Sequence, residues 1–382
     1  MTVRVAAGSS THVDDPAARR AEVETKLERV RAWLEASELE GLLLSAQANF
    51  AWITAGGRSH ISIGEAGGVA SVLVTHDRAF LLTTNIEVRR LIEEEVEGLP
   101  LDPVDRRWYT PGDERAAIAE ICDPSRTVSD LESAGLALAA PGFVELRRVL
   151  LPSEQARYRA LGRDVAEALE TAAREAQPGE LELEVAGRIA FECARRDILP
   201  LVNLVATDER IARHRHPLPA ATPVGKTLLV ALTGRRYGLH ASLTRMVSFG
   251  APDDELEARH RAVTRVDAAV IAASAPGTSL GDVMAVGMDR YAAEGFPREW
   301  ELHHQGGLTG YAGREVFATP GEPYRLRADQ ALAWNPSITR VKSEDTILVT
   351  AGGFEILTRS SWPMRGVEVG DTVVERPSIL LR

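Results

Sequence analysis

The second half of the sequence carries a weak internal duplication, and this repetition restricts the fold more than any other feature. Two pairs of helical segments occur, each followed by apolar, strand-like sequence, and a Pro-Gly break separates the members of each pair. The helices are predicted at 153–176, 183–196, 252–275 and 282–294, and the strands at 227–232, 331–334 and 346–350. The pattern predicts two α+β halves related by a pseudo-twofold axis.

The sequence before this duplication alternates strands with helices, which is typical of a small α/β domain. Apolar residues at helical spacing predict a helix over 20–38, and Asn85 is placed to cap another helix. Strands are predicted at 41–45, 69–75 and 79–84. Pro152 ends the regular structure that precedes it, just before the first long helix. We therefore expect a flexible leader at 1–19, an α/β domain at 20–148 and an α+β domain at 149–382.

Composition excludes several classes of function. The net charge of -11 argues against nucleic acid as a partner, because such binding needs a basic surface. Two cysteines, Cys122 and Cys193, are too few for a disulfide framework or a cysteine-ligated zinc site. No segment has the apolar length of a signal peptide core or a membrane span. We expect a cytoplasmic protein that has no membrane partner.

Histidines supply the first candidate site residues. Five of the nine fall in two groups, His214 with His216 and His240 with the pair His303-His304. Imidazole titrates near neutral pH, so it can act as a general base, a general acid or a metal ligand. For His214 and His304, clustering next to glycine, in loops between predicted strands, favours a functional role over a structural one.

An acidic pair, Glu344-Asp345, opens a predicted β-branched strand. Side chains alternate along a strand, so these two face opposite ways and at most one enters a given site. The alternative is a charge on an edge strand that deters aggregation.

Taken in order, these segments resemble the creatinase/aminopeptidase P/methionine aminopeptidase family, which has the pita-bread fold. The motifs are His214-x-x-Pro217, Ser242-Leu-Thr-Arg245, His304-x-x-Gly307, Trp334-Asn-Pro336 and Ser343-Glu-Asp-Thr346. The resemblance covers nearly the whole chain and implies an α+β fold of two domains.

The resemblance also implies which side chains correspond to the ligands of the family's two metal ions. The two aspartates fall on Ala231 and Ser242, the histidine on His304, and the two glutamates on Asn335 and Glu344. One imidazole and one carboxylate are too few to bridge two dications. We therefore expect no metal cofactor, with a single weak divalent ion at His304 and Glu344 left open.

The resemblance to creatinase, a family member that lacks the metal centre, implies roles for the remaining residues. His214 would be the general base, Glu344 would orient an imidazole or pair with substrate, and His304 and Asn335 would stabilise the oxyanion. Arg58, from the second subunit of a homodimer, would bind a substrate carboxylate.

Further residues are expected to contact a small-molecule substrate: His216, Ser242, Thr244, Arg245 and His303. Thr244 and Asn335 replace two creatinase glutamates, so creatine is a poor candidate and a neutral amide, ureido or amidine-like group fits better.

Three functions follow as hypotheses. The leading one is a metal-independent hydrolase of a C–N bond in a small substrate. The second is a metal-dependent X-Pro aminopeptidase or dipeptidase. The third is a catalytically inactive pita-bread module that binds a peptide or protein.

Overall fold

The computed structural model describes residues 15–110 and 112–382. The chain forms two compact units, Met1–Glu154 and Gln155–Arg382, which divide close to the predicted boundary after residue 148. Most of the predicted leader lies outside the described residues. Its last part does not, because helix α1 begins at Pro16, capped by the side chain of Asp15, and residues 16–19 are helical rather than flexible.

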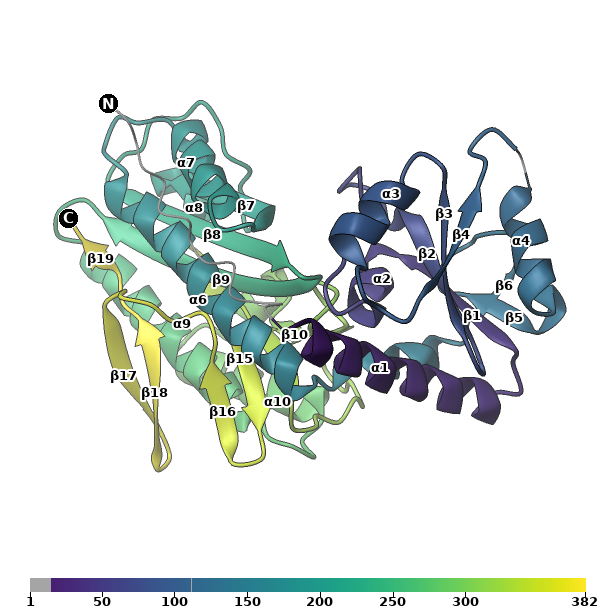
Figure 1. Ribbon diagram of the computed structural model, residues 1–382. Coiled ribbons are helices and arrows are strands. Elements are labelled where there is room, and N and C mark those ends of the chain that lie inside the picture. Colours follow the sequence, from purple (N-terminus) through teal and green to yellow (C-terminus); the bar gives the residue numbers. More distant parts are fainter. Residues whose placement is uncertain (1–14, 111) are drawn as a thin grey trace. The chain divides into compact units, whose positions relative to one another are not determined.

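The N-terminal unit is built on a six-stranded sheet of order β4-β3-β2-β1-β5-β6. The strands are β1 (Gly41–Ala46), β2 (Gly67–Thr75), β3 (Ala79–Thr84), β4 (Asp102–Arg106), β5 (Thr127–Ser129) and β6 (Ala137–Leu138). The helices are α1 (Pro16–Ala36), α2 (Gln47–Ile53), α3 (Val88–Arg90), α4 (Asp113–Ile121) and α5 (Glu145–Arg148). Helix α1 contacts β1 and β2 through its apolar face (Figure 1).

One predicted helix of this unit takes a different form. In place of a regular helix capped by Asn85, the chain makes the short α3 and then a π-helical turn over Leu91–Glu95. The side-chain oxygen of Asn85 accepts a hydrogen bond from the Trp108 amide at 3.2 Å, so it does not cap the helix. A contact distant in sequence therefore overrides the local signal.

The C-terminal unit contains the predicted helix pairs, each followed by antiparallel strands. The first half consists of α6 (Pro152–Glu175), α7 (Glu182–Ala194), β7 (Leu199–Thr207), α8 (Asp208–Arg213), β8 (Thr227–Arg236) and β9 (Leu239–Ser248). The second consists of α9 (Asp254–Ala273), α10 (Leu280–Ala293), β10 (Gly306–Thr309), β11 (Val316–Phe317), β12 (Gln330–Trp334), β13 (Ser337–Ile338), β14 (Val341–Lys342), β15 (Asp345–Thr350) and β16 (Gly353–Ile356). A hairpin of β17 (Met364–Val369) and β18 (Thr372–Pro377), and the short β19 (Leu380–Leu381), end the fold.

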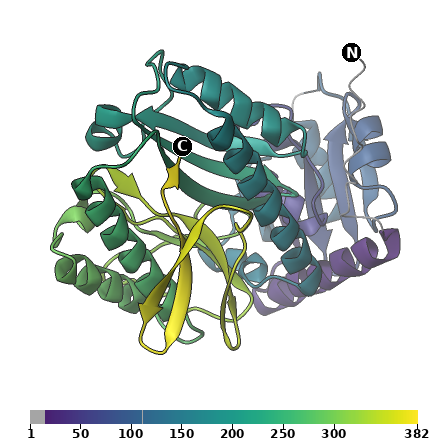
Figure 2. The same ribbon diagram turned by 90° about the vertical axis from the view of Figure 1, so that its left-hand side faces the viewer.

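The two halves join at their sheets. One has the order β19-β9-β8-β7 and the other β11-β10-β12-β15-β16. A bridge between Thr244 of β9 and Glu344, just before β15, connects them. Helix α6 lies across the first sheet (Figure 2), where Gly234 permits the approach, because a Cβ there would lie 2.6 Å from a methyl carbon of Val165. Apolar side chains of α9, α10, β10, β12 and β15 form the core of the second half.

A buried histidine in α9 gives a pH-dependent stability. Burial, together with the charges of Arg365 and Arg376, lowers the pKa of His260 to about 3. In the unfolded chain this imidazole titrates near ~6.5, so below that pH only the unfolded state takes up the proton. The contribution of His260 to stability is thus complete above pH ~6.5 and is lost as the pH falls toward the folded-state value.

We expect His260 to account for a loss of about 2 kcal/mol in the free energy of unfolding between pH 7 and 5. Urea denaturation measures the free energy of unfolding at both pH values. Between pH 7 and 5 this free energy should fall by about 2 kcal/mol less in His260→Gln than in the wild type. His76→Gln, an exposed control, should retain the wild-type drop. Equal pH dependence in wild type and His260→Gln would contradict the assignment.

No helix in the described part of the chain is both long enough and apolar enough to cross a membrane.

Candidate functional site

A cavity of about 360 Å³ lies in the C-terminal unit, where its two halves meet. Side chains from both sheets and from the intervening loops line it: Leu201, Val202, Leu204, His216, Ala231, Leu232, Thr233, His240, His304, Gly313, Arg314, Phe317, Asn335, Lys342 and Glu344. Four of the five positions that correspond to the family's metal ligands are among them. The fifth, Ser242, shares a hydrogen bond of 2.9 Å with Thr233 of the cavity wall.

A buried carboxylate with two cationic partners forms the polar part of this cavity. Glu344 lies 3.2 Å from the Lys342 amine and 4.0 Å from the Arg314 guanidinium. The hydroxyl of Thr244 donates to the same carboxylate at 2.6 Å. Burial alone would raise the pKa of Glu344, but Lys342, Arg314 and Thr244 outweigh it and hold this pKa below its usual value. Glu344 is therefore ionised at neutral pH.

Three histidines meet at the edge of the cavity. His216 follows α8 in the chain, and His303 and His304 precede β10. The Nε2 atoms of His216 and His303 are 2.9 Å apart, and the rings of His303 and His304 stack with centroids 4.5 Å apart. His216 is the third member of this cluster, whereas His240, which the sequence groups with His303 and His304, lines the same cavity as His304 at another place.

The histidine cluster is uncharged at neutral pH. Burial, followed by the charge of Lys342, lowers the pKa of His303 to about 2. Burial and the charge of Arg314 lower the pKa of His304 to about 4, and burial lowers that of His216 as well. Each imidazole therefore carries a nitrogen lone pair that is available to a proton donor or a metal ion.

The structure distributes the predicted site residues unevenly. His304, His216, Asn335 and Glu344 line the cavity, whereas His214 is exposed at the end of α8 and is not among the lining residues. The Asn335 Oδ1 atom is buried and has no hydrogen-bond partner among the described residues, so it is open to a ligand.

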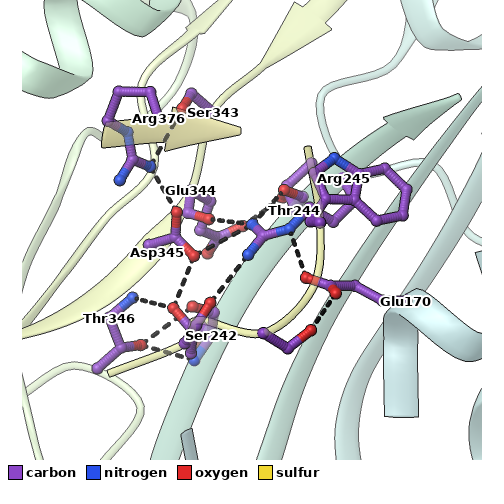
Figure 3. A network of polar contacts seen from close by, with 12 residues as sticks. Glu170, Ser242, Thr244, Arg245, Ser343, Glu344, Asp345, Thr346 and Arg376 are labelled. Carbon is purple, nitrogen blue, oxygen red and sulfur yellow. Dashed lines mark hydrogen bonds and ion pairs between the residues drawn. The ribbon is translucent and has the colours of Figure 1, made fainter. Parts of the chain in front are cut away.

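Arg245 does not reach the cavity. Its guanidinium is buried and pairs with Glu170 and Asp345 at 3.1 Å each, and it donates to the Thr358 carbonyl at 2.9 Å (Figure 3). Asp345 also pairs with Arg376, so the residue next to Glu344 belongs to a structural ion network. We therefore no longer assign Arg245 to substrate binding. The predicted opposite orientation of Glu344 and Asp345 agrees with this arrangement.

Ser242 and Thr244 are also placed behind the cavity wall, with their hydroxyls bonded to Thr233 and Glu344. Arg58 belongs to the N-terminal unit, where its backbone and side chain contact Glu95 at 2.8 and 3.1 Å. Its role toward a neighbouring subunit, and the homodimer itself, remain predictions.

Sequence reasoning missed the two cations of the cavity. Lys342 precedes Glu344 by two residues, and the two-residue period of extended chain places such side chains on one face. The position of Lys342 beside Glu344 could therefore have been predicted from the sequence. Arg314 follows β10 in a loop and had no comparable signal, because the conformation of a loop does not follow from residue spacing.

An α/β unit followed by two α+β halves around one cavity defines the two-domain pita-bread class. The chain belongs to metallopeptidase family M24, which it matches over residues 156–374, and it matches the creatinase/prolidase N-terminal domain over residues 26–140. The family and the fold predicted from the sequence are confirmed.

Solved structures share this fold at low sequence identity. The Xaa-Pro dipeptidase from Bacillus anthracis superimposes with a TM-score of 0.75 at 17% identity, covering 94% of this chain and 100% of that one. The prolidase from Pyrococcus horikoshii OT3 gives 0.74 at 16% identity, covering 88% and 99%. An uncharacterized peptidase of Staphylococcus aureus strain MW2 is 28% identical over 125 residues. That match spans 31% of this chain and only 35% of the relative.

The family match corrects one expectation. We expected no cofactor, but the family is one of metallopeptidases, and this contradicts a metal-free protein. The residues present nevertheless do not fit a two-ion centre at the usual positions. Ala231, Ser242 and Asn335 offer no carboxylate there, and Glu344 is already paired with Lys342. The usual set of ligands for two ions is therefore incomplete in this chain.

Proposed function

We propose that this protein hydrolyses the amide bond of a small peptide that carries a free carboxylate. The observation that supports the proposal is the charge of the cavity. Lys342 and Arg314 are both mostly buried and share a single carboxylate, Glu344. Because His216 and His304 are neutral, Lys342, Arg314 and Glu344 together leave one positive charge in excess, and a substrate carboxylate would balance it.

The remaining walls of the cavity fit the other parts of such a substrate. Leu201, Val202, Leu204 and Phe317 form an apolar side that would take a hydrophobic side chain. The amide of Asn335 can orient a peptide bond. A cavity of about 360 Å³ admits a compound of dipeptide size rather than a folded chain.

Membership of a peptidase family supports amide hydrolysis over the creatinase-like reaction expected from the sequence. Among the cavity residues, His304 and His216 are neutral bases that feel the charges of Lys342, Arg314 and Glu344, and they replace His214 in this proposal. Arg314 and Lys342 would hold the carboxylate, which fixes the distance between it and the scissile bond.

Dipeptides with free and with amidated C-termini test this proposal. In buffer containing zinc, cobalt or manganese, we expect kcat/KM for the free form to exceed that for the amide by about 10–100-fold, as one charged hydrogen-bonded contact provides. Arg314→Gln should remove most of this preference. Arg159→Gln, at an exposed ion pair with Glu355, should keep it. Equal cleavage of both forms by the wild type, or cleavage of neither, would refute the proposal.

A further inference from the structure

We infer that His216, His303 and His304 form a binding site for one divalent transition-metal ion. Each of the three offers a ligand nitrogen, and these atoms lie within 4.8 Å of one another. Two of them, His216 and His303, do not correspond to any ligand of the family's two-ion centre. This ion site is separate from the proposed function, because neither its ligands nor its test depends on peptide hydrolysis.

Neighbouring contacts hold the cluster in place. Arg215, next to His216 in the chain, donates to Ser337 at 3.1 Å and to Thr339 at 3.0 Å, and it pairs with Glu299. Glu299 begins the short 3-10 helix that ends before His303. The loop that carries His216 is thereby tied to the segment that carries the other two histidines.

Hydrogen bonding within the protein does not account for this arrangement. His303 is buried, and its Nδ1 atom makes no hydrogen bond of normal geometry in the described part of the chain, although the ring approaches the backbone of His304. Its other nitrogen faces a second imidazole nitrogen, that of His216, at 2.9 Å. A buried polar atom without a partner destabilises the folded state. Three neutral imidazoles brought together at such a cost are explained by an ion that uses their lone pairs.

The distances are compatible with tetrahedral binding after a small adjustment. Zinc–nitrogen bonds of about 2.0–2.1 Å place two ligand nitrogens roughly 3.3 Å apart. The contact between His216 and His303 is already shorter than this, and no two ligand nitrogens of the cluster are more than 4.8 Å apart. His216 is exposed, so rotation of its side chain can close the difference.

The donor set and the nearby charges determine which ion fits. Three nitrogen donors favour zinc, cobalt, nickel or copper, whereas magnesium, calcium and manganese prefer oxygen. Lys342 and Arg314 repel a cation at His304, and Glu344 offsets only part of this repulsion, so the affinity for the first ion must come from the three nitrogen ligands. No anionic group among the described residues that line the cavity is left to balance a second dication. His216 and His304 both line the cavity, which leaves the fourth coordination position for water or substrate.

Titration of the chelator-treated, full-length protein with Zn²⁺ in a calorimeter tests the site. We expect one ion per chain in the wild type, and no comparable binding of Mg²⁺. His216→Ala and His303→Ala should each weaken Zn²⁺ binding at least ~100-fold, since each removes a ligand. His214→Ala, two residues from His216 and exposed, should change it less than ~3-fold. Circular dichroism and the Tm of each variant without metal report whether it is folded.

Three outcomes would overturn the inference. The first is a wild type that binds no stoichiometric Zn²⁺. The second is binding that folded His303→Ala retains but Glu344→Gln loses, which would place the ion at His304 and Glu344 instead. The third is loss of binding in His214→Ala alone. Co²⁺ spectra offer a second readout, because tetrahedral cobalt absorbs far more strongly in the visible range than octahedral cobalt.

Discussion

Replacing Arg376 by methionine is expected to lower the free energy of unfolding by about 3–5 kcal/mol. Its guanidinium is fully buried and pairs with Asp267 at 2.5 Å and Asp345 at 2.6 Å (Figure 3 shows the contact with Asp345). Methionine has a similar length and fills the same volume, but it leaves the buried carboxylates of Asp267 and Asp345 without the cationic partner that they share. Arg245 still reaches Asp345, so Asp267 bears most of the loss.

Urea denaturation at neutral pH measures this effect. Arg159→Met is a matched control, because its ion pair with Glu355 is exposed and should contribute less than about 1 kcal/mol. The double variant Arg376→Met with Asp267→Asn should recover part of the loss, since the carboxylate most in need of a partner is then neutral. A change below about 1 kcal/mol in Arg376→Met would contradict the role of this network.

Glu344→Gln is expected to destabilise the protein by about 3 kcal/mol. The substitution keeps the shape of the side chain but removes the carboxylate that Lys342 and Arg314 share. Both cations lie in a largely buried cavity, where an unpaired charge is costly. The hydrogen bond from Thr244 also loses its charged acceptor.

A second substitution isolates the charge effect. Lys342→Met in the Glu344→Gln background should return about 1–2 kcal/mol, because one unpaired cation is removed. In the wild-type background, Lys342→Met should be mildly destabilising, since Arg314 still balances Glu344. If the double variant is no more stable than Glu344→Gln alone, charge pairing is not what stabilises this cavity.

The periodic parts of the structure could be predicted from the sequence. Both helix pairs, the strands after them and the opposite directions of Glu344 and Asp345 follow from periods of 3.6 and two residues. The same two-residue period could have excluded Arg245 from the expected substrate contacts. Arg245 follows Thr244 in β9, so the two side chains point to opposite faces of the strand.

The conformations of the loops could not be predicted in this way. The sequence selected His214 as the general base and His216 as a substrate contact, but of these two the structure brings only His216 to the cavity, because Arg215 between them is tied to Glu299 and Thr339. Those partners are distant in sequence, and no local pattern indicates them. The histidine cluster likewise depends on two loops from different halves of the unit, so only the fold reveals it.

The position of Arg376 in the last hairpin also bears on how the protein is made. A ribosome releases Asp267 and Asp345 before β18 emerges, and until then these two acids cannot both be dehydrated at low energetic cost. Folding of the C-terminal unit should therefore be completed only after this hairpin has left the ribosome. Nascent chains halted before this hairpin would expose apolar surface, which makes them candidates for chaperone binding.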